Sequence, residues 1–393
     1  MRLLICAGGT GGGVYPALAV LKALQDDEER LRKSIEPKNL AQPDIDEMEV
    51  VWVGGEGGIE VELLRGEKVD FRAIPAAGVH GVGLNALPGN LWKILKGFFA
   101  ARKIIKQFSP KVMFFTGGYL AVPVAIAGRT FLSKMQRPRI LLYVPDIEPG
   151  LALKTLSNLS DEIALTVEDS MKYFDFRSNL HVTGYPVRPN LRAYSREQAQ
   201  QEFNLLPHLP TLLVFGGSKG ARSINRALAA ILPQLLIDIQ VIHISGHLDW
   251  EEMESLKEQL PDPIQSRYHV YAYLYQEMDA ALSAADLVVS RSGASVLGEF
   301  PLFGLPAILV PYPHAWRYQE VNARYLEENG AAVVLQDDEL NNKLLATIQD
   351  LIMDLDRRKR MGQTMTKLAN PHAAENIAEL IYERTSLPAP GRI

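Results

Sequence analysis

Short apolar runs alternate with segments whose apolar residues recur at helical spacing, and this alternation begins at the first residues. In the first half the strand-like runs are residues 3–6, 49–55, 71–74, 111–118, 140–144 and 162–166. A charged, proline-containing stretch at residues 25–48 departs from the pattern and indicates a helix end followed by a surface insertion. Strands that alternate with helices in this way form parallel βαβ units with right-handed crossovers. The pattern therefore predicts an α/β protein.

The alternation stops at residues 181–189, which contain two prolines and a glycine, and then starts again. The strand-like runs of the second half are residues 211–215, 240–245, 269–273, 287–290, 307–310 and 332–335. Prolines and glycine at the interruption are typical of an extended connection. We expect two doubly wound domains, residues 1–185 and 186–372, with a last helix within residues 373–393 that packs back on the first domain.

A glycine-rich turn follows the first strand-like run of each half, at residues 8–13 and 216–221. Glycine lets the backbone turn sharply, and a helix that starts at such a turn presents free N–H groups to an anion. Two copies suggest two halves that share one phosphorylated ligand. Neither turn has the G-x-G-x-x-G spacing, and no acidic residue ends the second strand, which disfavours a dinucleotide-dependent oxidoreductase.

Composition narrows the class of protein. A net charge of −5 argues against a nucleic-acid binder. The single cysteine, Cys6, lies in an apolar run, which excludes a disulfide framework and favours a buried thiol over a nucleophile. No apolar run approaches the roughly 18 residues of a membrane span, and the first residues do not resemble a cleavable signal. The eight histidines are scattered without metal-ligand spacing, so we expect no metal site.

Several polar residues of the second half stand where a nucleotide would bind. Glu299 follows the small-residue turn 291–298, and its carboxylate has the geometry to accept both ribose hydroxyls; an exposed helix glutamate is an equal alternative. Lys219 and Arg188 are suited to neutralise a diphosphate, although single basic residues are more often solvated. Gln319 and Asn322 lie one helical turn apart and face sugar hydroxyls if that face is buried.

Residues 87–108 mix aromatic and aliphatic residues with lysine and arginine. A helix of this kind rests on an anionic bilayer with its apolar face down and its cations at the headgroups. An ordinary surface helix with a solvated basic face is the alternative on the pattern alone.

Taken in order, the motifs resemble those of MurG-type glycosyltransferases over most of the chain. They are Gly8-Gly9-Thr10-Gly11-Gly12, Tyr15-Pro16-Ala17, Gly117-Gly118-Tyr119, Val182-Thr183-Gly184, Pro186-Val187-Arg188, Gly216-Gly217-Ser218, Arg291-Ser292-Gly293-Ala294, Glu299, Gly304-Leu305-Pro306-Ala307, His314, Gln319 and Asn322-Ala323. The resemblance implies a GT-B fold of two Rossmann-like domains with a cleft between them. It also implies inverting, metal-independent transfer of N-acetylglucosamine from UDP-N-acetylglucosamine to a polyprenyl-diphosphate-linked muramoyl-pentapeptide. No cofactor is implied, and the family works at the cytoplasmic face of the membrane.

Carried over position by position, the resemblance assigns donor contacts to both halves. It implies that the UDP-sugar is held by Thr10, Gly11, Gly12, Arg188, Ser218, Lys219, Tyr275, Ala294, Glu299, Gln319 and Asn322. Residues 78–99 match the membrane-facing segment of the family. The resemblance therefore favours membrane contact over an ordinary surface helix. The side chains expected at the bilayer are Leu91, Trp92, Leu95, Phe98 and Phe99.

The chain departs from the family pattern mainly on the acceptor side. Gly13 stands where the family has histidine, and residues 143–146 replace a His-Glu-Gln-Asn turn. We expect Asp146 to act as the general base, helped by Glu148 or His80, with helix capping as its alternative role. These departures keep two other functions open, a UDP-sugar transferase with a different acceptor and a catalytically silent paralogue that binds nucleotide sugar.

Overall fold

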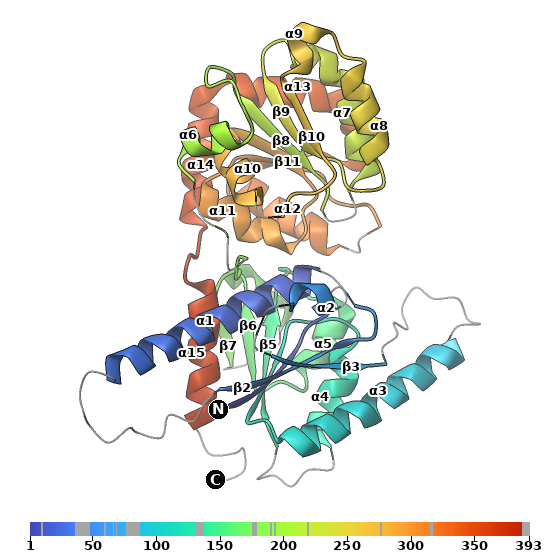
Figure 1. The fold of residues 1–393 in the computed structure, drawn as a ribbon, viewed down its shortest axis with the longest axis vertical. Helices are drawn as coiled ribbons and strands as arrows, with labels where there is room; N and C mark the ends of the chain where they lie inside the picture. Colours follow the sequence, from blue (N-terminus) through green and yellow to red (C-terminus); the bar gives the residue numbers. More distant parts are fainter. Residues whose placement is uncertain are drawn as a thin grey trace. The chain divides into compact units, whose positions relative to one another are not determined.

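The computed structural model describes residues 1–8, 11–35, 48–58, 60–65, 67, 69–75, 87–130, 137–174, 179–188, 191, 194–217, 220–275, 277–314 and 317–386. The chain divides into two compact units (Figure 1). Unit 1 comprises Met1–Pro189 and Pro371–Ile393, and unit 2 comprises Asn190–Asn370. The sequence boundary expected after residue 185 lies a few residues before this division.

Unit 1 contains a parallel sheet with the strand order β3-β2-β1-β4-β5-β6-β7 in its described part. The strands are β1 (Arg2–Cys6), β2 (Glu49–Gly55), β3 (Asp70–Ile74), β4 (Val112–Phe115), β5 (Arg139–Val144), β6 (Glu162–Leu165) and β7 (Leu180–Val182). The helices are α1 (Gly11–Ile35), α2 (Glu60–Leu63), α3 (Leu87–Phe108), α4 (Ala121–Arg129), α5 (Leu151–Ser157), η4 (Glu168–Tyr173) and α15 (Ala373–Ser386).

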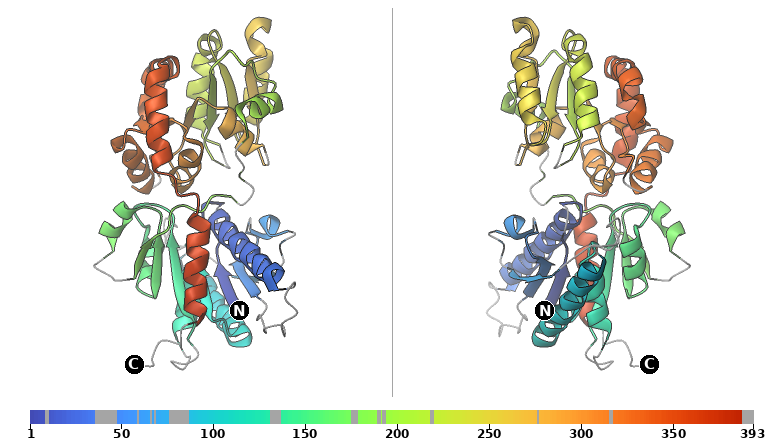
Figure 2. Two further views of the ribbon diagram at one scale, coloured as in Figure 1. Left: turned by 90° about the vertical axis from the view of Figure 1, so that its left-hand side faces the viewer. Right: turned by 90° about the vertical axis from the view of Figure 1, so that its right-hand side faces the viewer.

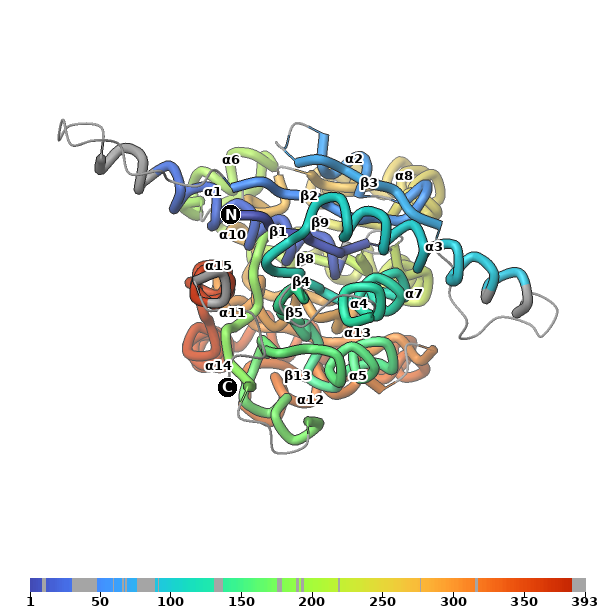
Figure 3. The backbone as a smooth tube through the Cα atoms, turned by 90° about the horizontal axis from the view of Figure 1, so that it is seen from below, coloured from blue at the N-terminus to red at the C-terminus, as the bar shows by residue number. Residues whose placement is uncertain are grey.

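Helices cover both faces of this sheet, which is why its central strands are apolar throughout. Leu4 and Cys6 of β1 join the core cluster under α3, α4 and α5. The opposite face is covered by α1 and α15, which contact each other and cross (Figures 1 and 3). The Tyr382 hydroxyl of α15 donates to the Leu24 carbonyl of α1 at 3.0 Å, and Asn376 Nδ2 donates to the Thr183 carbonyl at 3.1 Å. The C-terminal helix therefore belongs to unit 1.

Unit 2 repeats the arrangement with the strand order β10-β9-β8-β11-β12-β13 among its described residues. The strands are β8 (Thr211–Phe215), β9 (Gln240–Ile244), β10 (Tyr268–Tyr271), β11 (Leu287–Ser290), β12 (Ala307–Leu309) and β13 (Ala332–Val334). The helices are α6 (Arg196–Glu202), α7 (Arg222–Leu235), α8 (Trp250–Glu258), α9 (Asp262–Gln265), α10 (Met278–Ala284), η5 (Ala294–Leu297), α11 (Glu299–Phe303), α12 (Tyr318–Glu328), η6 (Asp337–Glu339), α13 (Leu340–Met353) and α14 (Leu355–Lys367).

The side views in Figure 2 show the sheet of unit 2 between two layers of helices. One layer, formed by α7, α8 and α13, packs on the apolar side chains of β8 to β12. In both units the strand order reverses beside the first strand, between β1 and β4 and between β8 and β11. Such a switch point is where open α/β sheets bind ligands at the carboxyl ends of their strands. The prediction of two doubly wound parallel sheets is confirmed.

Candidate functional site

The turn after β8 has a backbone that requires glycine. Gly217 and Gly220 have φ angles of +94° and +78°, and a Cβ on Gly220 would lie 2.2 Å from the carbonyl oxygen of Ser245. The turn leads into α7, whose N-terminal N–H groups favour an anion. Two expected donor contacts, Ser218 and Lys219, belong to this turn and lie outside the described residues.

A buried polar network lies under the start of α7. Arg222 Nε donates to Asp249 Oδ1 at 2.8 Å, and Asn225 Nδ2 donates to Asp249 Oδ2 at 2.8 Å. Because the amide nitrogen of Asn225 is used in this way, its oxygen accepts from His243 Nε2 at 3.0 Å, and His243 Nδ1 accepts from the Tyr268 hydroxyl at 2.7 Å. Burial lowers the pKa of His243 to about 3. The imidazole is therefore neutral, and the network holds α7 against β9.

Arg291, directly after β11, joins several elements at the carboxyl edge of the sheet. Its guanidinium donates to Ser223 Oγ at 2.7 Å and to Asp337 Oδ1 at 2.5 Å. The same group lies over the ring of Tyr312, 5.2 Å from its centroid. With its donors shared among these partners, Arg291 fixes the loop that precedes η5.

Two of the expected donor contacts, Gln319 and Asn322, lie on α12 and are bonded to Ser292 in the loop after β11. The buried Asn322 donates from Nδ2 to the Ser292 carbonyl at 3.1 Å, and Ser292 Oγ donates to the Gln319 carbonyl at 2.8 Å. Gln319 Oε1 accepts from the backbone N–H of Tyr312 at 2.9 Å. Gln319 and Asn322 therefore bind the first turn of α12 to the loops after β11 and β12.

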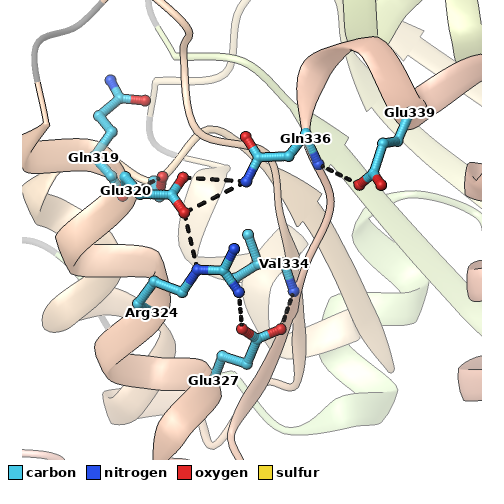
Figure 4. A network of polar contacts seen from close by, with 8 residues as sticks. Gln319, Glu320, Arg324, Glu327, Val334, Gln336 and Glu339 are labelled. Carbon is cyan, nitrogen blue, oxygen red and sulfur yellow. Dashed lines mark hydrogen bonds and ion pairs between the residues drawn. The ribbon is translucent and has the colours of Figure 1, made fainter.

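Figure 4 shows how the other side of the α12 start is held. Glu320 Oε1 accepts from Arg324 Nε at 2.8 Å, and the two Glu320 oxygens lie 3.4 and 3.3 Å from Gln336 Nε2. Arg324 Nη1 also pairs with Glu327 Oε2 at 2.5 Å. This network fixes the position from which Gln319 extends.

Glu299 is the first residue of α11, one residue after the short helix η5 that begins at Ala294. Between η5 and α11 the backbone breaks at Gly298, which has φ of −123° and ψ of −50°. The Glu299 side chain is buried rather than solvated. Ala294 and Glu299 thus follow β11 at the switch point of unit 2.

Aromatic side chains follow β9 and β10 at the same edge. The rings of Tyr273 and Tyr275 lie 4.6 Å apart, and His247 stacks on Tyr273 with centroids 6.2 Å apart. Tyr275 is 72% exposed, and its backbone N–H donates to Glu277 Oε2 at 3.2 Å. The segment around Tyr275, expected to contact the UDP-sugar, is therefore an accessible aromatic surface.

In unit 1 the glycine turn after β1 leads into α1, which starts at Gly11. Gly12 is exposed, and the Gly13 carbonyl accepts from the buried Thr116 hydroxyl at 2.7 Å. A Cβ on Gly13 would lie 3.4 Å from Thr116 Oγ1, an ordinary contact distance. A Cβ at position 13 is therefore sterically acceptable. Thr10 lies outside the described residues.

Arg188, expected to contact the donor, belongs to unit 1 by its packing. Its guanidinium lies over the ring of Tyr15 on α1, 5.4 Å from the centroid. The cation therefore stands beside the first turns of the helix that follows β1.

Asp146 and Glu148 follow β5 at the carboxyl edge of the first sheet. Asp146 is partly exposed, and Glu148 is buried. Nearby, the buried Tyr143 hydroxyl shares a 2.8 Å hydrogen bond with Thr166 Oγ1. Burial raises the pKa of Tyr143 well above its ordinary value, with smaller contributions from Tyr185 and Asp146. The third expected catalytic residue, His80, lies outside the described residues.

The outward face of α3 carries apolar side chains among cations. The exposed apolar residues are Trp92, Leu95 and Phe99, with exposed fractions of 59%, 44% and 57%. Lys96 Nζ lies 5.6 Å from the centroid of the Trp92 ring. Phe98, expected with this set, packs instead against the core of unit 1, because it points inward toward the sheet. The Leu91 side chain is not among those described.

The described residues contain neither a candidate membrane span nor a candidate metal site. None of their helices is long and apolar enough to cross a bilayer. No group of three or more His, Cys, Asp or Glu side chains in the described ranges is arranged to hold a metal ion.

Sequence reasoning missed the connecting roles of Arg291 and His243. Arg291 was visible only as part of a motif, and His243 as a polar residue inside an apolar strand. The second signal was available, because a histidine in a fully buried strand requires polar partners. The identity of these partners, Asn225 on α7 and Tyr268 on β10, depended on the packing of the sheet.

The family models that match this chain cover both units. The model described as glycosyltransferase family 28 N-terminal domain matches residues 38–140, and the corresponding C-terminal domain model matches residues 211–380. Two curated relatives are named UDP-N-acetylglucosamine--N-acetylmuramyl-(pentapeptide) pyrophosphoryl-undecaprenol N-acetylglucosamine transferase. That of Roseiflexus sp. (strain RS-1) is 38% identical over 97% of this chain and 94% of the relative. That of Desulforamulus reducens is 36% identical over 97% and 98% of the two chains.

The chain belongs to glycosyltransferase family 28. The crystal structure of MurG from Acinetobacter baumannii, 25% identical, matches 97% of this chain and 99% of its own with a TM-score of 0.70. The UDP-GlcNAc 2-epimerase of Neisseria meningitidis has the same fold at a TM-score of 0.62, with 13% identity over 98% of this chain and all of its own. Membership of this family and the similarity to the MurG structure establish that the protein has the GT-B fold and is a glycosyltransferase.

Proposed function

We propose that this family 28 glycosyltransferase transfers N-acetylglucosamine from UDP-N-acetylglucosamine to a muramoyl-pentapeptide carried on a polyprenyl diphosphate, a step in peptidoglycan synthesis. The observation that carries the proposal is full-length identity of 34–38% to curated enzymes named for this reaction. The names of those relatives specify both the donor and the lipid-linked acceptor.

The polar edge of unit 2 supports donor binding. The N-terminus of α7 and the loop after β11 offer N–H groups to a diphosphate. The buried carboxylate of Glu299 is suited to accept the ribose hydroxyls, and the ordered start of α12 places Gln319 near the sugar. We assign Ser218, Lys219, Ala294, Tyr275 and Asn322 to the same donor site.

The reaction we write inverts the anomeric carbon. A hydroxyl oxygen of the muramoyl acceptor attacks C1 of the N-acetylglucosamine from the side opposite UDP. The C1–O bond breaks, and its electron pair leaves with the diphosphate. The hydroxyl proton passes to Asp146, with Glu148 or His80 as helpers. Arg188, Thr10, Gly11 and Gly12 offset the charge on the leaving group.

We further propose that α3 rests on the cytoplasmic face of the membrane. Trp92 and Phe99 are exposed large apolar residues on a helix that also exposes Lys93, Lys96 and Arg102. Such a face gains apolar contact with lipid and electrostatic attraction to anionic headgroups. The enzyme would then meet its lipid-linked acceptor as a peripheral protein.

Radiolabel transfer tests the proposal. Purified enzyme is incubated with labelled UDP-N-acetylglucosamine and a panel of polyprenyl-diphosphate sugars with and without the pentapeptide. We expect label in the muramoyl-pentapeptide lipid alone. Label only in another lipid would make this a transferase with a different acceptor. Donor binding without transfer to any acceptor would make it a silent paralogue.

The general base is tested by Asp146→Asn. We expect turnover to fall by about 100-fold or more, the usual size of a general-base contribution, with UDP affinity unchanged. Asp169→Asn, an exposed carboxylate of the same unit, serves as the matched control. Near-normal turnover of Asp146→Asn would remove Asp146 from this role.

A different acceptor is the second candidate function, and one observation favours it. The family histidine is replaced by Gly13, although a Cβ at that position would meet Thr116 at an ordinary contact distance. Steric need therefore does not explain the glycine. The acceptor panel distinguishes this candidate from the first.

A further inference from the structure

A buried carboxylate in unit 2 has no role in the reaction as written. Asp249 follows β9 and stands immediately before α8, at the position where an aspartate commonly caps a helix. Its side chain makes no capping bond to α8. Both of its oxygens accept from α7 instead, Oδ1 from Arg222 Nε and Oδ2 from Asn225 Nδ2, each at 2.8 Å. The Asp249 side chain is 5% exposed, so its charge is stabilised by a neighbouring helix rather than by water.

The start of α7 carries a charge opposite to that of an ordinary helix start. Acidic side chains are favoured at a helix N-terminus, where the dipole is positive and the N–H groups have no partner within the helix. The described first turn of α7 contains no acidic residue, and its first residue, Arg222, is a cation. The N-cap, Ala221, makes no side-chain capping bond. An acid on α7 itself would compete with a bound anion for these N–H groups, whereas Asp249 pairs with the cation from another loop.

The same contacts hold the glycine turn after β8 against the end of β9. Asn225 uses its second Nδ2 hydrogen to donate to the Ser245 carbonyl at 2.8 Å. Gly220 lies against that carbonyl, since a Cβ on Gly220 would be 2.2 Å from its oxygen. Asp249 therefore fixes the side chain that connects the start of α7 with the end of β9.

We propose that Asp249 is a positioning residue for the donor diphosphate. Its carboxylate ties the first turn of α7 to the loop after β9, so that the N–H groups at the start of α7 stay aligned for the phosphates. Asp249 acts through Arg222 and Asn225 and does not touch the nucleotide. The inference rests on the proposed function in one respect, namely that UDP binds at this turn.

Asp249→Asn separates positioning from a purely structural role. Asparagine keeps the size of the side chain, but it has one acceptor oxygen for two donors and places an N–H₂ group where the other oxygen was. Positioning predicts that UDP affinity falls by about tenfold, since small displacements of aligned groups have effects of up to about a hundredfold. Uridine has the base and the ribose but no phosphate, so it should bind as it does to the wild type. A purely structural role predicts lower thermal stability with both affinities unchanged.

The experiment compares Asp249→Asn with Glu254→Gln, which changes an exposed carboxylate on α8. Calorimetry measures UDP binding and ligand-observed NMR measures uridine binding, at a temperature where melting curves show each variant to be folded. Amide exchange of the peptide that spans β8 and the start of α7 is measured with and without UDP. We expect weaker UDP binding and reduced UDP-induced protection for Asp249→Asn alone. Wild-type UDP affinity in this variant, or equal losses for UDP and uridine, would overturn the proposal.

The result remains distinguishable from a failure of the proposed function. UDP binding needs no acceptor, so a wild type that binds UDP but transfers no sugar still decides the role of Asp249. A wild type that binds no UDP refutes the donor site and this proposal together. Should Asp249→Asn fail to fold, Arg222→Gln removes the exposed partner of the same carboxylate. A loss of affinity for UDP but not for uridine then supports the proposal, and unchanged UDP affinity overturns it.

Discussion

Acidification should destabilise unit 2 through His243, which is buried and neutral beneath α7. Its pKa in the folded protein is about 3, compared with 6.5 for an accessible histidine. As the pH falls below 6.5, the unfolded chain binds a proton that the folded chain does not bind until about pH 3. The stability contribution is therefore complete above pH 6.5 and is lost progressively as the pH falls toward 3.

The magnitude follows from the pKa difference. One pKa unit corresponds to about 1.4 kcal/mol, so at pH 5 the loss from His243 is about 2 kcal/mol. Typical domains have only about 5–15 kcal/mol of stability. His269, whose pKa burial lowers to about 4, acts in the same direction. Because His243 accepts from Tyr268 and donates to Asn225, its protonation also disturbs the support of the donor turn.

Urea unfolding at pH 7.5 and pH 5, followed by amide exchange of unit 2 peptides, measures this effect. The wild type should lose at least about 2 kcal/mol between the two conditions. His243→Gln should be less stable at pH 7.5 but lose about 2 kcal/mol less on acidification, whereas the exposed His208→Gln should behave as the wild type. A His243 ring that titrates near pH 6.5 by NMR, or equal pH dependence in His243→Gln, would refute the reasoning.

Three further predictions concern the two substrates and the membrane. Glu299→Gln should weaken UDP binding by about tenfold to a hundredfold, because hydrogen bonds to a charged group contribute about 1.5–3 kcal/mol, and should leave 2′,3′-dideoxy-UDP binding unchanged; equal losses for both nucleotides would exclude the ribose contact. Gly13→His should fold, since its Cβ meets Thr116 at an ordinary distance, and should raise turnover with the muramoyl lipid; unchanged or lower turnover would show that position 13 does not limit the reaction. The double variant Trp92→Ser with Phe99→Ser should lose co-sedimentation with anionic vesicles while keeping turnover in detergent, and retained co-sedimentation would exclude α3 as the membrane face.

The strands of unit 2 were predictable almost to the residue. The expected runs 211–215 and 287–290 coincide with β8 and β11, because buried parallel strands are continuous apolar runs. The sequence pattern instead predicts a connection between domains at residues 181–189, where the structure has the end of the short, partly exposed strand β7 followed by a proline-containing segment. The local sequence pattern carries no signal for the break between η5 and α11 at Gly298.

The candidate site was also predictable only in part. Glycine turns and motif residues such as Glu299 and Gln319 were visible in the sequence, since their positions after strands place them at one edge of the sheet. The contacts between residues distant in the sequence were not visible. Glu60 belongs to none of the motifs, and only the fold brings Gly8, Gly54 and Gly58 around its buried carboxyl group. His243 likewise acquired its neutral state from burial between α7 and β10.

The central claim is that unit 2 binds UDP-N-acetylglucosamine and that its sugar passes to a muramoyl-pentapeptide lipid. The most direct measurement follows radiolabel from UDP-N-acetylglucosamine into lipid products made by the purified enzyme in anionic vesicles. The account predicts one labelled product, the disaccharide lipid, formed with release of UDP in equal amount. UDP binding without any labelled lipid, or label in a lipid that lacks the muramoyl sugar, would contradict it.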